Sequence, residues 1–182
     1  MLSNISFKKA IWLSPIVYLF HIIEEAVFGF YKFMNKHLGG GENDLISFLL
    51  ANMIIMAVYI ILNIIFTLQP YRFNAFFVLT LLAAAQFFNA FYHLLWTIVF
   101  REYCPGVVTG FVIYVPFVSI LLWIAYREEY ITKTSVALIL LLGAILMSLF
   151  EIEDFQILVL IISPTVVILT NIIYYFKTQS KK

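Results

Sequence analysis

Three ionisable side chains fall within one short segment of the first long apolar stretch of the chain: His21, Glu24 and Glu25. At about 100° per residue of an α-helix, all three share one helical face. His21 follows Lys9 by about 18 Å of helix, which puts it near the middle of a bilayer. Because each uncompensated charge at that depth costs on the order of 2.5–3.5 kcal/mol, these groups are expected to find partners inside a helix bundle.

A second polar stripe lies on the third apolar stretch. Gln86, Asn89 and His93 are spaced i, i+3 and i+7, so they share one face of a helix. Asn89 lies about 24–25 Å along its helix and Glu25 about 24 Å along the first. The two stripes are therefore predicted to meet at a common depth. Gln86, together with Asn52 on the second stretch, is expected to hydrogen-bond around this site or between helices.

The charge balance of these groups favours a metal ion. Two carboxylates and two neutral imidazoles sum to two negative charges, which a divalent cation neutralises. Histidine and carboxylate ligands suit Zn²⁺ or Fe²⁺. We predict that His21, Glu25 and His93 bind the metal. The carboxylate left over would act as general base, so Glu24 and Glu25 are both catalytic candidates, and Asn89 would orient a ligand or bind substrate.

Other interpretations of the same residues stay open. With protonated histidines or carboxylates, the group would be a metal-free acid/base site, such as that of a lipid double-bond isomerase with aromatic rings around a carbocation-like intermediate. It could instead carry protons or ions in a transporter, or belong to an accessory subunit. The simplest alternative is a static His21–Glu25 pair that holds helices together.

The composition indicates a polytopic membrane protein. Of 182 residues, 64% are hydrophobic and 12% are charged, and the mean hydropathy is +1.02. Soluble domains carry about 45–50% apolar and about 25% charged residues, so a soluble globular protein and a disordered chain are excluded. A net charge of +1 leaves no basic face for nucleic acid. One cysteine, Cys104, excludes a disulfide framework and a zinc ribbon.

The apolar stretches predict an all-α bundle of about six spans in a single transmembrane domain over residues 1–182. Each is continuously apolar over roughly the 20 residues that a membrane helix needs, without the alternation of a barrel strand. The predicted spans are Ala10–Tyr31, Leu45–Leu68, Phe73–Phe100, Val107–Tyr126, Thr134–Phe150 and Phe155–Phe176.

The distribution of basic residues predicts that both termini are cytoplasmic. An even number of crossings puts eight of the 11 Lys and Arg residues on the side of the termini and three on the opposite side. Short cytoplasmic loops carry the excess of Lys and Arg. The opposite side holds Lys32, Lys36 and Arg101; the side of the termini holds Lys8, Lys9, Arg72, Arg127, Lys133, Lys177, Lys181 and Lys182.

Three motifs in order resemble the bacterial integral-membrane family named for its HXXEE motif. They are His21-x-x-Glu24-Glu25, Asn89-x-x-x-His93 and Tyr103-Cys104-Pro105-Gly106, and the resemblance covers approximately residues 13–110. It implies a protein of the bacterial cytoplasmic membrane with motifs suggestive of catalysis and no established activity. Cys104 stands where the family usually has serine. Both a hydroxyl and a thiol could serve as a nucleophile, whereas cysteine is the poorer helix cap.

The third motif adds a loop that would cover the site. Pro105 suits the first turn of a helix, and the amides from Gly106 onward would point the positive end of the helix dipole at the site. Together with Tyr103 and Cys104, they could polarise an anionic or carbonyl group of a substrate. The alternative is that Tyr103–Gly106 is only a turn and a helix start.

These observations predict an intramembrane metal-dependent hydrolase that acts on a lipid or a lipid-linked amide or ester. Its cofactor would be Zn²⁺ or a similar divalent ion, and its site would open toward the outer leaflet. Its expected partners are the bilayer and that substrate, and nucleic acid is not among them.

Overall fold

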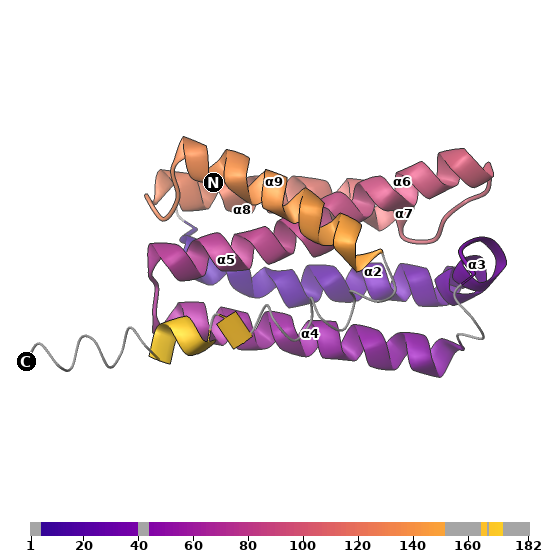
Figure 1. Cartoon of the computed structure of the whole chain (residues 1–182), viewed down its shortest axis with the longest axis horizontal. Coiled ribbons are helices and arrows are strands. Elements are labelled where there is room, and N and C mark those ends of the chain that lie inside the picture. The colour runs from indigo at the N-terminus through magenta and orange to yellow at the C-terminus, as the bar shows by residue number, and fades with distance from the viewer. Residues whose placement is uncertain (1–4, 40–43, 152–164, 167, 173–182) are drawn as a thin grey trace, which may run out of the picture.

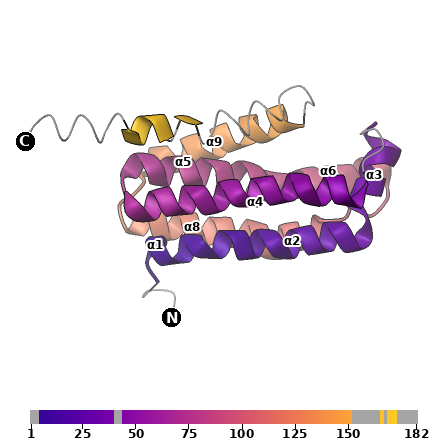
Figure 2. The same ribbon diagram turned by 90° about the horizontal axis from the view of Figure 1, so that it is seen from below.

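The protein is a bundle of long helices that run side by side (Figure 1 and Figure 2). The computed structural model describes residues 5–39, 44–151, 165–166 and 168–172, and every regular element within these ranges is helical. The predicted all-α fold is therefore confirmed.

Within the described residues, five helical stretches are long and apolar enough to cross a membrane, which makes this an integral membrane protein. They are Phe7–Phe28, Leu45–Leu68, Arg72–Phe100, Val107–Arg127 and Lys133–Phe150. These correspond to the first five predicted spans. The sixth predicted span, at 155–176, lies mostly outside the described residues. The orientation of the termini stays a prediction.

The first crossing ends earlier than predicted, because Gly29 adopts a left-handed conformation with φ of 76°. The Gly29 N–H still bonds to the Glu25 carbonyl, and the chain then turns into a short helix, α3. Figure 1 shows α3 at one end of the bundle. Glycine reaches this conformation without a Cβ penalty. The crossing consists of α1 (Phe7–Ala10), a 3₁₀ turn η2 (Ile11–Leu13) and α2 (Ser14–Phe28), and α3 covers Phe30–His37.

Two of the later crossings are interrupted by π-helical turns, η3 and η4. Such turns insert an extra residue and are frequent at functional sites. η3 directly precedes Asn89, and η4 begins directly after Thr109. The elements are α4 (Leu45–Leu68), then α5 (Arg72–Leu82), η3 (Ala83–Phe88) and α6 (Asn89–Phe100), then α7 (Val107–Thr109), η4 (Gly110–Tyr114) and α8 (Val115–Arg127), and finally α9 (Lys133–Phe150).

Small residues bring the third crossing close to its neighbours. A Cβ added at Gly143 of α9 would lie 2.8 Å from the Cβ of Ala83, and one added at Gly110 would lie 2.9 Å from the Cβ of Ala90. Small residues allow this close approach where lipid supplies no hydrophobic drive between helices. These close contacts place the third crossing, which carries the polar stripe of Gln86, Asn89 and His93, inside the bundle.

Candidate metal centre

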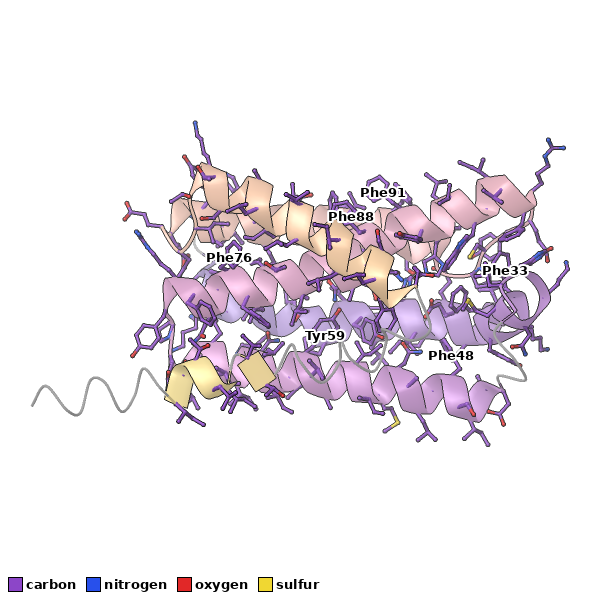
Figure 3. The ribbon with its side chains drawn as sticks, viewed as in Figure 1. Phe33, Phe48, Tyr59, Phe76, Phe88 and Phe91 are labelled. Atoms are coloured by element: carbon purple, nitrogen blue, oxygen red, sulfur yellow. The ribbon has the colours of Figure 1, made fainter. Side chains whose placement is uncertain are left out.

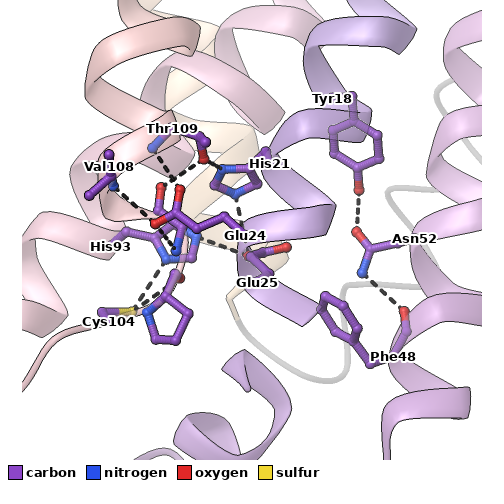
Figure 4. A network of polar contacts seen from close by, with 12 residues as sticks. Tyr18, His21, Glu24, Glu25, Phe48, Asn52, His93, Cys104, Val108 and Thr109 are labelled. Atoms are coloured by element: carbon purple, nitrogen blue, oxygen red, sulfur yellow. Dashed lines mark hydrogen bonds and ion pairs between the residues drawn. The ribbon is translucent and has the colours of Figure 1, made fainter. Parts of the chain in front are cut away.

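Two crossings bring His21, Glu25 and His93 together in the interior of the bundle (Figure 4). His21 and Glu25 are one turn apart on α2, and His93 lies on α6. Their exposed fractions are 2%, 4% and 0%. One ligand atom from each lies within 4.8 Å of the other two. The predicted meeting of His21 and Glu25 with His93 is confirmed, and this buried group could hold a metal ion.

Two of the three separations among these atoms are compatible with the spacing of metal ligands. Glu25 Oε1 lies 3.3 Å from Nε2 of His21 and 3.3 Å from Nε2 of His93. Although these are ion-pair distances, neither Nε2 atom has a partner in hydrogen-bond geometry within the described structure. In a tetrahedral site with bonds of about 2.0–2.1 Å, neighbouring ligand atoms are about 3.3–3.4 Å apart. Both 3.3 Å separations from Glu25 Oε1 match this distance between neighbouring ligand atoms.

The other nitrogen of each imidazole is engaged by the start of the fourth crossing or the loop before it. His21 Nδ1 lies 2.8 Å from the Thr109 hydroxyl, which itself points to the Gly106 carbonyl at 3.5 Å. A hydroxyl that donates its proton to a carbonyl can only accept from the ring, so this arrangement corresponds to the His21 tautomer with the hydrogen on Nδ1. The Nε2 lone pair is then left facing Glu25.

His93 is held in the same way by Cys104. Its Nδ1 lies 3.3 Å from Cys104 Sγ, and the thiol is directed at the Pro105 carbonyl at 3.8 Å. Burial raises the pKa of the Cys104 thiol, so it stays protonated. A thiol that donates to the Pro105 carbonyl can accept only from the ring, which corresponds to the His93 tautomer with the hydrogen on Nδ1. With the hydrogen of each ring on Nδ1, the two Nε2 lone pairs and a Glu25 oxygen are three electron-pair donors that converge on one point.

Glu24 faces a different neighbour from Glu25. Its Oε1 accepts the amides of Gly106 at 3.0 Å and Val108 at 3.3 Å, and its Oε2 accepts the Thr109 amide at 2.7 Å. The Tyr103 hydroxyl donates to Oε1 as well. Desolvation and the neighbouring carboxylate raise the pKa of Tyr103, so this donor keeps its proton. The amides that the sequence suggested for a substrate oxygen are therefore occupied by Glu24, which caps the fourth crossing.

Aromatic side chains fix the planes of the imidazoles. The ring centroids of His21 and Tyr114 are 4.4 Å apart, and those of His93 and Phe30 are 4.9 Å apart. Trp96 lies beside His93 at 5.8 Å. Such walls keep both rings in one orientation and exclude water from one side of the site.

A cavity of about 300 Å³ opens beside the triad, and His21, Glu25 and Asn89 are part of its wall. Asn89 is half-buried and its Oδ1 has no partner in the described structure, so its carboxamide is available to a bound molecule. Asn52 also lines the cavity and accepts a hydrogen bond from the Tyr18 hydroxyl. Phe48 and Tyr59 lie in the layer between α4 and α2 (Figure 3).

Gln86 lies apart from the triad. Its amide nitrogen donates to the Ser14 carbonyl at 3.2 Å, and it does not line the cavity. It therefore ties the third crossing to the start of α2. Thr109 and Tyr114 touch the histidines but were not singled out from the sequence, because a threonine or tyrosine within an apolar helix has no spacing that distinguishes it.

The chain matches a family model described as a protein of unknown function with HXXEE motif, over residues 12–124. The match covers more than half of the chain and all three motifs. No curated protein and no solved structure matches the chain.

Proposed function

Because the chain belongs to the HXXEE family, whose function is unknown, we propose a function from its site: an intramembrane, metal-dependent hydrolase of a lipid or lipid-linked amide or ester. The observation that carries the proposal is the pair of 3.3 Å separations between Glu25 Oε1 and the two imidazole Nε2 atoms. Three buried acceptors at that spacing repel one another, and a divalent cation among them removes the repulsion.

The donor set fits a catalytic zinc site. Two imidazole nitrogens and one carboxylate oxygen leave the fourth tetrahedral position for water or substrate. The cation, Glu25 and the nearby Glu24 together sum to zero charge, which favours burial. When bound, the cation would act as a Lewis acid that polarises a carbonyl and acidifies water.

The remaining side chains have distinct roles in this proposal. Glu24 is not the base in this proposal but a positioning residue, because backbone amides hold its oxygens. Glu25 belongs both to the triad and to the cavity wall; with Oε1 facing the imidazoles, its second oxygen, Oε2, is the proposed acceptor of a proton from water. Thr109 and Cys104 orient the imidazoles through Nδ1. Asn89 binds a polar group of the substrate through its unpaired oxygen.

Metal analysis of the purified protein tests the proposal. We expect about one divalent ion per chain, and its loss in His21→Ala, His93→Ala and Glu25→Gln. The third histidine of the chain, His37, pairs with Glu102 away from the triad, so His37→Ala should keep the ion. Folded protein that binds no divalent ion, or equal loss in His37→Ala, would contradict a metal site at the triad.

The same contacts support a metal-free acid/base enzyme as a second candidate. Glu25 lies at ion-pair distance from both imidazoles, so a proton could be shared among the three groups. The aromatic rings of Phe30 and Trp96, which line the cavity beside His93, could stabilise a cationic intermediate of an apolar lipid. Lipid turnover that survives exhaustive chelation would favour this candidate over the hydrolase.

A further inference from the structure

The cavity beside the triad is long and narrow. Its lining on α4 runs along one helical face from Ser47 to Tyr59, which corresponds to about 18 Å of helix. Spread over that length, a volume of about 300 Å³ accommodates one extended chain rather than the paired chains of a membrane lipid. The shape therefore favours a single-chain amphiphile.

The two ends of the cavity differ in chemistry. Toward Tyr59 the wall is mostly apolar, with Ile55 and Val58 of α4 and Leu81 and Ala85 of the third crossing beside the rings of Tyr18 and Tyr59. The wall also includes the polar residues Tyr31, Ser47 and Glu151, which lie at the end of the bundle where α4 begins. His21, Glu25 and Asn89 lie between the ends. A chain would occupy the apolar end and a polar head the other.

The charges of the lining disfavour an anionic head. Besides three tyrosines, the ionisable residues among the described lining are His21, Glu25 and Glu151, and this part of the chain contributes no lysine or arginine to the wall. A phosphate or carboxylate head at the polar end would be removed from water without a cation beside it, which is costly. A positively charged head would meet a carboxylate instead.

Glu151 is the group that would receive such a head. It follows α9 directly as its C-terminal cap, is half-buried, and forms no ion pair within the part of the chain described. The C-terminal end of a helix carries a partial negative charge, which attracts cations as well. Burial without a cation raises the pKa of Glu151 to about 7.

We propose that this cavity binds a single-chain amphiphile with a primary amine head. The ammonium group lies against Glu151, the chain passes the triad and ends among the apolar residues near Tyr59. The proposal rests on the proposed function in one respect, that the bound amphiphile is the substrate of the hydrolase. Binding of the amphiphile itself needs no metal.

Binding of brominated probes with one common chain length tests the head preference. Trp96 lines the cavity, so a variant carrying Trp12→Phe and Trp123→Phe reports occupancy through quenching of the remaining tryptophan. We expect bromododecylamine to bind roughly tenfold more tightly than the matching alcohol, carboxylate or phosphate. Glu151→Gln should remove that preference, whereas Glu102→Gln, outside the cavity, should keep it.

A second pair of variants tests where the chain lies. Ala85→Phe fills the apolar end and should weaken all probes, whereas Ala57→Phe on the exposed face of α4 should weaken none. Anionic probes that bind as tightly as the amine, or an amine preference that survives Glu151→Gln, would overturn the proposal. Quenching can be measured equally well on chelated protein. An amine preference on chelated protein would therefore stand even if the protein proved not to be a metal-dependent hydrolase. A metal-loaded, active enzyme that shows no preference for the amine head would refute the amphiphile proposal and leave the hydrolase proposal standing.

Discussion

The backbone of Gly106 lies directly against the imidazole of His93. A Cβ added at Gly106 would be 2.7 Å from Cε1 of His93 and 2.8 Å from Cε1 of His21. Gly106 also has φ of 102°, which L side chains rarely adopt. The last residue of the third motif is therefore a glycine because this loop covers both histidines of the first two motifs.

Gly106→Ala is expected to remove the metal while the bundle stays helical. The added methyl must displace both rings, which moves two of the three ligand atoms away from a common centre. We expect at least a tenfold loss of metal affinity, measured by competition with a chelator, with an unchanged far-ultraviolet spectrum.

Gly39→Ala is the matched control for backbone strain. Gly39 has φ of 68°, but a Cβ there would have nothing within 4 Å. This variant carries a similar left-handed strain without the contact, and should keep its metal. If both alanine variants lose metal to the same extent, strain in the chain and not the contact with the histidines is the cause.

Substitution of the adjacent carboxylates Glu24 and Glu25 should have different effects, on stability in the first case and on metal binding in the second. Glu24→Gln weakens charge-assisted hydrogen bonds from the Gly106 and Thr109 amides, and is expected to lower the free energy of unfolding by about 1–3 kcal/mol. Glu25→Gln removes a ligand and should abolish metal binding with a smaller effect on the metal-free protein. Thermal unfolding and metal content, measured on both variants, check this; an exchange of the two phenotypes would contradict the assignment.

The helical crossings were predictable because each is a continuous apolar run in a chain that lipid forces into helices. The second crossing has the predicted bounds, Leu45–Leu68. The first was predicted to reach Tyr31, since hydropathy does not register the left-handed turn at Gly29. The π-helical turns η3 and η4 were not predicted, because an extra residue within a uniformly apolar helix leaves no trace in its pattern.

The site was predictable to the level of its helices but not of its individual contacts. Helical periodicity put His21, Glu24 and Glu25 on one face, and helix length matched the depth of Glu25 to that of Asn89, one turn from His93. It could not separate the roles of the two glutamates, because they differ by about 100° and the neighbour that each meets depends on the 103–109 segment. That segment has no periodic signal, and its contacts are long-range in sequence.

Stability should depend on pH near neutrality through Glu151. Burial raises its pKa from 4.5 to about 7, so between these values the folded protein holds a proton that the unfolded chain has released. Unfolding then releases a proton, and stability falls as pH rises through this window and levels off above it. Glu151→Gln should remove that part of the profile in thermal unfolding at successive pH values. A profile identical to that of the unmodified protein would show that Glu151 titrates normally.

Cys104 offers the sharpest test of how His93 is oriented. Its thiol accepts the Nδ1 hydrogen of His93 at 3.3 Å, and a hydroxyl is a stronger acceptor than sulfur. Cys104→Ser, which installs the residue that the family resemblance suggests there, should therefore keep the metal or bind it more tightly. Cys104→Ala removes the acceptor and is expected to lower metal affinity about 10-fold to 100-fold, as for other partners of ligand histidines.

Since the Cys104 thiol is buried and protonated, it should also resist alkylation in the folded protein. Rapid labelling, or activity lost in the serine variant but kept in the alanine variant, would show that Cys104 does something other than orient the ring.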